Sequence, residues 1–150
     1  MGYNDLRGWM EEVEKQGELK TVEGAHWDKE IGGISELMAE RGGPALLFDK
    51  IQDYPQGFRV LSNAFLTHKR TTPVLGIPDN LSSVAMVDAF RKRLKTLKPI
   101  PPVTVKDGPV KENVLTGKDV DLLKLPTPLW HDKDGGRFIG TGCAVITRDP

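Results

Sequence analysis

The sequence contains a single cysteine, Cys143, which excludes two ways of building a stable site. An intrachain disulfide bond needs a second cysteine, and a cysteine-based zinc site needs several thiolates. Scarce cysteine is typical of proteins from a reducing compartment, so we expect a cytoplasmic protein. No basic partner for Cys143 is evident, and we therefore expect a buried, unreactive thiol rather than a nucleophile.

The sequence also lacks a surplus of either charge and any long apolar run. Lysine plus arginine and aspartate plus glutamate each number 21, so the formal net charge is zero. A phosphate-backbone binder needs a basic excess or stripe, and the one basic cluster, at residues 91–98, is expected on the solvated face of a helix. No apolar run approaches the ~20 residues that cross a bilayer, and the acidic, amphipathic N-terminus is not signal-like. We expect neither a nucleic-acid nor a membrane partner.

Hydrophobic spacing in the first part of the chain predicts helices and strands in alternation. Apolar residues at i, i+3, i+4 and i+7 predict a first helix that is capped by Asn4 and stopped by Gly17. A second helix should begin at Asp28 and end at Gly42-Gly43, although the glycine pair at residues 32–33 weakens a helix. Short runs at residues 18–22, 44–49 and 58–61 predict strands, of which the last two could form a hairpin.

Two further helices are expected before residue 99. A short one should run from Thr67 to Pro73, and a longer one, capped by Asp79, should reach about Leu97. The longer helix should bury one apolar stripe, made of Val84, Val87, Phe90, Leu94 and Leu97.

The composition changes at Pro99, where a polyproline-like connector begins. Beyond it, short β-type runs at residues 103–105, from 110 onward and at 120–125 alternate with turns, and a longer run covers 137–147. The predicted fold class is therefore α/β, with a compact N-terminal α/β domain at residues 1–98. Residues 99–150 are expected to form the start of a second, β-rich domain that is incomplete.

Three histidines are the first candidates for chemistry, but their spacing matches no local metal-ligand pattern. For His26 and His68 we expect structural roles. His131 stands beside Trp130 and before Asp132 and Asp134, a string that could hold a hard cation or serve in acid–base work. The alternative is a polar turn that precedes a strand. No nucleophile, base and orienting group can be assembled from the sequence alone.

Glycines at 135, 136, 140 and 142 suggest a phosphate loop, but their context does not support one. A P-loop needs a Gly-Lys-Ser/Thr step and a dinucleotide fingerprint needs a following helix, whereas a strand-like run follows here. Glycine within a strand marks a bulge or the close approach of a ligand. This favours a flat ligand lying against the run at 137–147.

Four segments carry a resemblance to a known family. They are DLRGWMEEVEKQGELK, RGGPALLFDKI, GFRVLSNAF and the long block from PIPPVTVKDGP through DGGRFIGTGCAVITRDP. In this order the chain resembles, nearly end to end, the N-terminal part of the UbiD family of decarboxylases.

The resemblance implies a fold, a reaction and a cofactor. It implies a small α/β domain followed by the first strands of a split β-barrel of flavin-reductase type. UbiD-like enzymes remove CO2 reversibly from aromatic, heteroaromatic or α,β-unsaturated carboxylic acids. They use prenylated FMN, held with Mn2+ and K+, as an electron sink. The expected partners are an aromatic acid and CO2, together with further copies in a homo-oligomer or the remainder of the UbiD-like chain.

The resemblance also places the chemistry outside this chain. In the family the Asn, His and Glu residues that bind metal and phosphate, and the Glu-Arg-Glu network, follow the ITRDP strand. We therefore expect no catalytic residue and no metal ligand within residues 1–150, and His131 is not the family's ligand. Thr141 is the one expected cofactor contact. The chain should be the inactive front part of a decarboxylase, or else a non-catalytic module that docks on a UbiD-like partner.

Overall fold

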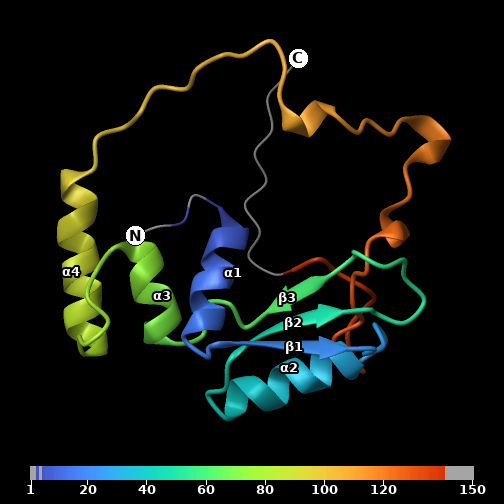
Figure 1. Ribbon diagram of the computed structural model, residues 1–150, viewed down its shortest axis with the longest axis horizontal. Coiled ribbons are helices and arrows are strands. Elements are labelled where there is room, and N and C mark those ends of the chain that lie inside the picture. Colours follow the sequence, from blue (N-terminus) through green and yellow to red (C-terminus); the bar gives the residue numbers. More distant parts are fainter. Residues whose placement is uncertain (1–2, 4, 141–150) are drawn as a thin grey trace. The chain divides into compact units, whose positions relative to one another are not determined.

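The computed structural model describes residue 3 and residues 5–140 of the chain. The chain divides into two compact units. One is His68–Leu122, and the other is Gly2–Thr67 together with the chain from Leu123 onward. The larger unit carries the sheet (Figure 1). The predicted domain division after residue 98 stays a prediction.

The sheet of the larger unit has three strands and two covering helices. In chain order the elements are α1 (Leu6–Lys15), β1 (Leu19–Glu23), α2 (Glu30–Glu40), β2 (Ala45–Asp49) and β3 (Val60–Ser62). The strand order is β1-β2-β3, with β1 parallel to β2 and β3 antiparallel to β2. The predicted helix-strand alternation and the hairpin are therefore confirmed.

The two faces of β2 bury different clusters because side chains alternate along a strand. Leu46 and Phe48 pack with Ile31 of α2, and all three are almost fully buried. Ala45 points to the other face, where Trp9 and Val13 of α1 cover it. The two helices thus lie on opposite sides of the sheet (Figure 1). A buried hydroxyl pair, Ser35 Oγ to Ser62 Oγ at 2.8 Å, ties α2 to β3.

Three predicted helix caps are wrong, each by a few residues. The cap of α1 is Asp5, whose carboxylate accepts the Gly8 N–H at 2.8 Å, rather than Asn4, which lies outside the described residues. The cap of α2 is Lys29 rather than Asp28, because Lys29 adopts a left-handed backbone with φ 66° and delays the helix start to Glu30. The cap of the long helix is Ser82, not Asp79, since the Ser82 hydroxyl accepts from Ala85 N–H.

The smaller unit contains two helices, α3 (His68–Leu75) and α4 (Ser83–Thr96). The predicted buried stripe of α4 is wrong, because none of its residues is buried. Val84 is 82% exposed and Val87 is 63% exposed. Helical periodicity shows that a face is apolar, but it does not supply the element that covers that face.

The strands predicted at residues 103–105, 110 onward and 120–125 are absent from the described part of the chain. Three single-turn 3-10 helices occur there instead, at Pro109–Lys111, Gly117–Asp119 and Leu122–Lys124. A β-type run needs a neighbouring strand edge, and without one its apolar side chains stay in solvent, as Val110 does at 90% exposure. The split β-barrel stays a prediction, as does the strand expected at 137–147, most of which lies outside the described residues.

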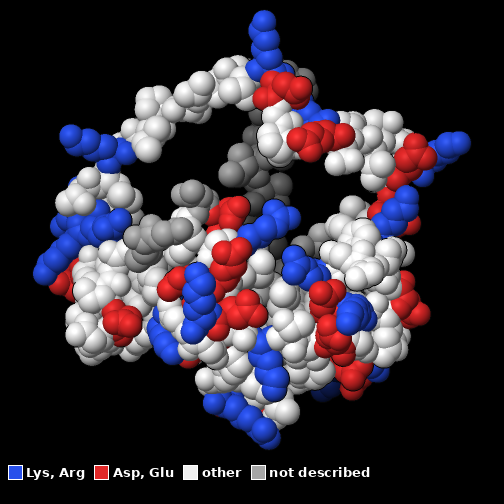
Figure 2. Space-filling model, viewed as in Figure 1, with Lys and Arg blue, Asp and Glu red and all other residues white. Residues whose placement is uncertain are grey.

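The surface of the molecule carries mixed charge. On the face drawn in Figure 2, basic and acidic side chains are interspersed, which agrees with the zero net charge of the sequence. Among the helices that the structure describes, none combines the length and the hydropathy needed to cross a membrane.

Burial predicts which leucines stabilise the larger unit. Leu46→Ala should lower the free energy of unfolding by about 2–5 kcal/mol, because the side chain is 1% exposed and its removal leaves a cavity. The matched control is Leu37→Ala on α2, whose side chain is 43% exposed and should cost less than about 1 kcal/mol. Urea denaturation measures both variants. Equal losses would contradict the assignment of the core to the β2–α2 interface.

Candidate functional site

Residues 125–139, the return segment, bring the end of the described chain back to the loop between β1 and α2. Asp28 and Leu129 form an isolated parallel β-bridge. Lys29 N–H donates to the Leu129 carbonyl at 2.8 Å, and Leu129 N–H donates to the Trp27 carbonyl at 3.1 Å. The left-handed backbone of Lys29 is therefore part of a backbone pairing, which explains why a non-glycine residue adopts it.

Gly32 allows the return segment to lie directly on the first turn of α2. A Cβ built on Gly32 would stand 1.9 Å from the Trp130 carbonyl oxygen, a separation that no side chain tolerates. Trp130 is held in turn by its indole N–H, which donates to the Phe138 carbonyl at 3.1 Å. The glycine that weakens the helix in the sequence is thus the residue that permits this backbone contact.

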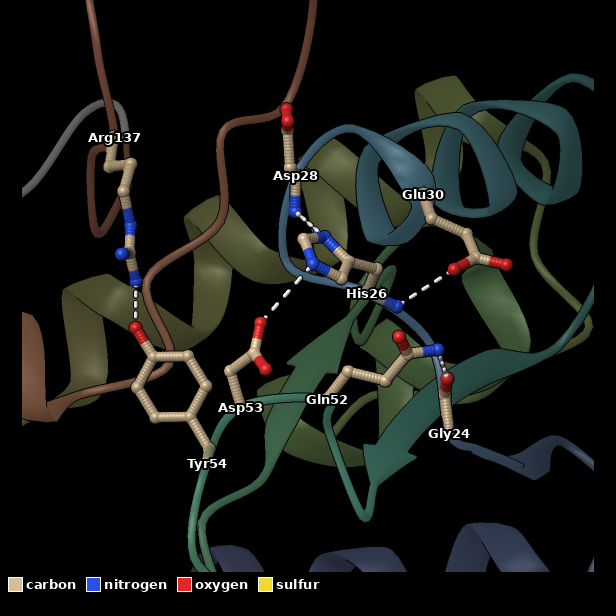
Figure 3. A network of polar contacts seen from close by, with 8 residues as sticks. All are labelled: Gly24, His26, Asp28, Glu30, Gln52, Asp53, Tyr54 and Arg137. Atoms are coloured by element: carbon tan, nitrogen blue, oxygen red, sulfur yellow. Dashed lines mark hydrogen bonds and ion pairs between the residues drawn. The ribbon is translucent and has the colours of Figure 1, made fainter.

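Arg137 joins the return segment to both loops at this end of the sheet. Its guanidinium carbon lies 4.2 Å from the centre of the Trp27 ring and 5.6 Å from that of Tyr54. The same group donates to the Thr127 carbonyl at 2.6 Å, to the Leu125 carbonyl at 3.4 Å and to the Tyr54 hydroxyl. Figure 3 shows Arg137 pointing at Tyr54 from the return segment. A planar cation with several donors can satisfy all these partners at once.

His26 links the same two loops through a defined tautomer. Its Nδ1 accepts the Asp28 N–H at 3.0 Å, so in this arrangement the proton lies on Nε2. That nitrogen faces the Asp53 carboxylate at 3.3 Å (Figure 3). The His26 ring stacks on Trp27 with centroids 5.2 Å apart, which continues the stack towards Arg137. The predicted structural role of His26 agrees with these contacts.

His131 lies in a polar turn of the return segment. Its backbone N–H donates to the Asp134 carboxylate at 2.8 Å, and its carbonyl accepts the Asp134 N–H at 3.2 Å. Its Nε2 lies 3.4 Å from Glu36 on α2. In the described part of the chain no cluster of three or more His, Cys, Asp or Glu residues could hold a metal ion. These contacts form the polar turn that was one of the two alternatives for His131, and a catalytic role for it is not tested.

An ion pair supplements the backbone pairing at the helix start. Lys29 Nζ lies 2.9 Å from Asp132 Oδ1. The hydrogen bond from Asp132, and then its charge, raise the pKa of the Lys29 ammonium above its ordinary value. A lysine whose pKa is raised on folding stabilises the folded state at pH values below its unfolded-state pKa. This stabilisation is lost as the pH rises through the raised pKa of the folded state. Both side chains are exposed, so this pair is the weakest part of the arrangement.

The predicted cofactor contact, Thr141, and the predicted buried thiol, Cys143, lie outside the described residues and stay predictions. The described residues offer no donor set for Mn2+, and the guanidinium of Arg137 is engaged by carbonyl groups of its own segment. These residues do not by themselves provide a site for prenylated FMN. Sequence reasoning missed Trp27, Tyr54 and Arg137. The Gly32-Gly33 pair, which is unfavourable in a helix, was the one feature of the sequence that indicated a close contact at this place.

The contact at Gly32 gives a prediction with a matched control in the next residue. Gly33→Ala should stabilise the protein by about 0.5–1 kcal/mol, because nothing lies within 4 Å of the new methyl group and alanine favours a helix. Gly32→Ala gains the same propensity but collides with Trp130, so it should lower the stability by about 1–3 kcal/mol. Urea denaturation followed by tryptophan fluorescence measures both. Two variants that are equally stabilised would show that Trp130 does not lie on α2.

A second prediction concerns the guanidinium of Arg137. Arg137→Lys keeps the charge but loses the planar fork, so it should lower the free energy of unfolding by about 1–3 kcal/mol and alter Trp27 fluorescence. The control is Lys133→Ala, an exposed residue of the same segment, which should change stability by no more than about 0.5 kcal/mol. If Arg137→Lys behaves like the control, the guanidinium does not hold the return segment.

Comparison with protein families gives two matches that together cover most of the chain. The model of the N-terminal domain of 3-octaprenyl-4-hydroxybenzoate carboxy-lyase, UbiD_N, matches residues 10–90. The model of the Rift-related domain of the same carboxy-lyase, UbiD, matches residues 102–150.

Two curated relatives are decarboxylases of much greater length. Pyrrole-2-carboxylic acid decarboxylase of Pseudomonas aeruginosa is 35% identical over 97% of this chain and 31% of its own length. Phenolic acid decarboxylase of Streptomyces sp. (strain D7) is 29% identical over 100% of this chain and 32% of its own length. The chain therefore spans about a third of these relatives.

Solved structures agree with this relationship. The vanillic acid decarboxylase of Sedimentibacter hydroxybenzoicus in its closed form has a TM-score of 0.77 at 30% identity, covering 91% of this chain and 29% of the other. An evolved dimeric form of the UbiD-class enzyme HmfF from Pelotomaculum thermopropionicum, in complex with prFMN, has a TM-score of 0.69 at 25% identity, covering 90% of this chain and 30% of the other. The UbiD_N model alone matches more than half of the chain, and the chain therefore belongs to the UbiD family of decarboxylases.

Proposed function

We propose that this chain is the N-terminal part of a UbiD-type (de)carboxylase that acts reversibly on an aromatic or α,β-unsaturated carboxylic acid through prenylated FMN. The observation that carries the proposal is that nearly the whole chain aligns with about a third of the length of each of two decarboxylases. The main catalytic residues then belong to the part of the enzyme that this chain does not align with.

In this proposal the chain supplies a scaffold rather than the acid–base groups. Residues 1–98 form the α/β domain and residues 99–150 begin the cofactor domain. The two family matches support this division, since one ends at residue 90 and the next begins at residue 102. Thr141 is the proposed cofactor contact, and it stands four positions after Arg137 in the sequence.

The contacts of Arg137 would then fix where the strand expected to border the cofactor begins. Its bonds to Thr127 and Leu125 and its contact with Trp27 fix the chain four residues before Thr141. When bound, the prenylated flavin supplies the electron sink for carbon–carbon bond cleavage. In this proposal Arg137 holds the residues that precede the expected strand through its contacts with Thr127, Leu125 and Trp27.

The wider proposal includes Mn2+ and K+ beside the flavin, an assembly with the remainder of the enzyme or with further copies, and a cytoplasmic location. The vanillic acid decarboxylase and HmfF structures support a shared scaffold, and the HmfF structure also contains prFMN. A non-catalytic module that docks on a UbiD-like partner is the alternative, and the following experiment separates the two.

A chimera tests the proposed function. The aligned third of the Pseudomonas aeruginosa pyrrole-2-carboxylic acid decarboxylase is replaced by this chain, and the protein is produced with prenylated FMN. We expect a flavin absorbance band and CO2 release from an aromatic acid within about tenfold of the parent enzyme, which is about 1.4 kcal/mol of barrier. Exchange of labelled CO2 into the acid measures the reverse direction.

The controls define what would overturn the proposal. The unaltered parent enzyme reports full activity, and the 150-residue chain alone should remain colourless with the same flavin supply. A folded chimera that holds no flavin would contradict the proposal. Co-purification of the free chain with the intact parent enzyme, combined with that result, would instead establish the docking module.

A further inference from the structure

A groove follows the free edge of β3 in the larger unit. One part is a cavity of about 420 Å³ on the α1 side of the sheet, where Met10, Leu47 and Leu61 provide apolar surface. The other part is a cavity of about 250 Å³ between β3 and the start of the return segment. Arg59 and Leu61 line both cavities, and we call the two cavities together the β3-edge groove.

The edge of β3 is open to a further strand. In the described sheet β3 pairs with β2 alone, and every second residue of an antiparallel strand turns its N–H and C=O groups outward. The segment that lies across the groove contains Pro126 and Pro128, both buried, and proline has no N–H with which to complete a ladder. A cavity therefore separates this segment from β3 where a hydrogen-bonded strand would fit.

The charged residues of the larger cavity are two arginines and Asp5, whose carboxylate caps α1, so the net charge of its lining is positive. The arginines are Arg7 of α1 and Arg59, just before β3. Both side chains are exposed, and the described residues show no ion pair for either. Apolar surface continues beside them at Leu6, which is 53% exposed, and at Ile139, which is 70% exposed. An occupant that matches this surface combines apolar side chains with a carboxylate.

We propose that the β3-edge groove binds an extended polypeptide strand that pairs with the outer edge of β3. The strand places apolar side chains against Leu47 and Leu61 and a carboxylate against Arg59, with Arg7 as a second cationic contact. Addition of a strand to an open sheet edge obtains affinity from main-chain hydrogen bonds and specificity from the alternate side chains. Arg59 and the apolar floor supply the specificity here.

The occupant is a strand from the remaining two thirds of a UbiD-type decarboxylase, and in this respect the inference rests on the proposed function. The relatives are about three times as long as the part that this chain matches, so they contain ample further chain. An exposed sheet edge with apolar surface around it is an aggregation hazard, and proteins commonly cover such edges. The unpaired arginines disfavour a second copy of this chain, because a symmetric pairing would bring like charges together.

Peptide titration tests the inference by binding alone, without reference to catalysis. Peptides of about nine residues, a long strand, tile the part of the Pseudomonas aeruginosa decarboxylase outside the aligned third. Each is titrated onto the isotopically labelled 150-residue chain while the amide signals of Val60–Ser62 and the methyl signals of Leu47 and Leu61 are followed by NMR. We expect an acidic peptide to shift these signals together.

Charge reversal identifies the contact. Arg59→Glu should weaken the binding of that peptide at least about tenfold, because the substitution replaces a charge-assisted hydrogen bond with a repulsion between two carboxylates. The matched control is Arg41→Glu at the C-cap of α2, an exposed arginine outside the groove, which should leave the affinity unchanged. Unchanged amide spectra of both variants outside the substituted residues confirm that they fold.

Three outcomes would overturn the inference. The first is that no peptide shifts the β3 signals, and the second is that Arg59→Glu binds as tightly as the unaltered chain. The third is that the same signals shift with protein concentration alone, which would assign the groove to a second copy of the chain. A chimera that lacks decarboxylase activity would overturn the proposed function but would not alter these binding results.

Discussion

The guanidinium of Arg137 is the interaction on which the placement of the return segment depends. It lies over Trp27 from the loop after β1, contacts Tyr54 from the loop after β2, and donates to two carbonyls of its own segment. One side chain therefore connects three stretches of chain that are far apart in the sequence. A partly buried cation of this kind is favourable only when most of its donors are satisfied, which they are here.

The backbone contact at Gly32 is the steric counterpart of this interaction. Trp130 lies on the first turn of α2 at a distance that excludes any side chain at position 32. The adjacent bridge between Asp28 and Leu129 requires the left-handed conformation of Lys29. The start of α2 is thus shaped by the return segment as much as by its own sequence, and the proposed cofactor strand begins where these contacts end.

The sequence predicted the layers of the larger unit but not the contacts between them and the return segment. Periods of about 3.6 and 2 located α1, α2 and the strands, because the apolar side chains of these elements are buried against one another. The same periodicity failed for α4, where Val84 and Val87 are exposed, since a pattern does not reveal what covers it. The predicted cap of α2 was wrong because Lys29 is constrained by Leu129, a residue one hundred positions away.

Family resemblance supplied what local patterns could not. The decarboxylase family was recognisable from the order of the chain's segments and then from whole-chain matches. Arg137 was missed because a guanidinium within a glycine-rich stretch has no local signature. Its partners, Trp27 and Tyr54, stand more than eighty residues earlier in the chain.

Amide hydrogen exchange of Lys29 and Leu129 tests the central claim most directly, because these two N–H groups are bonded between the return segment and the α/β unit. If the return segment is part of that unit, both amides should exchange as slowly as those in the middle of α2. Exchange as fast as that of the exposed residues 112–116 would show that the return segment is not held there, and would contradict the account.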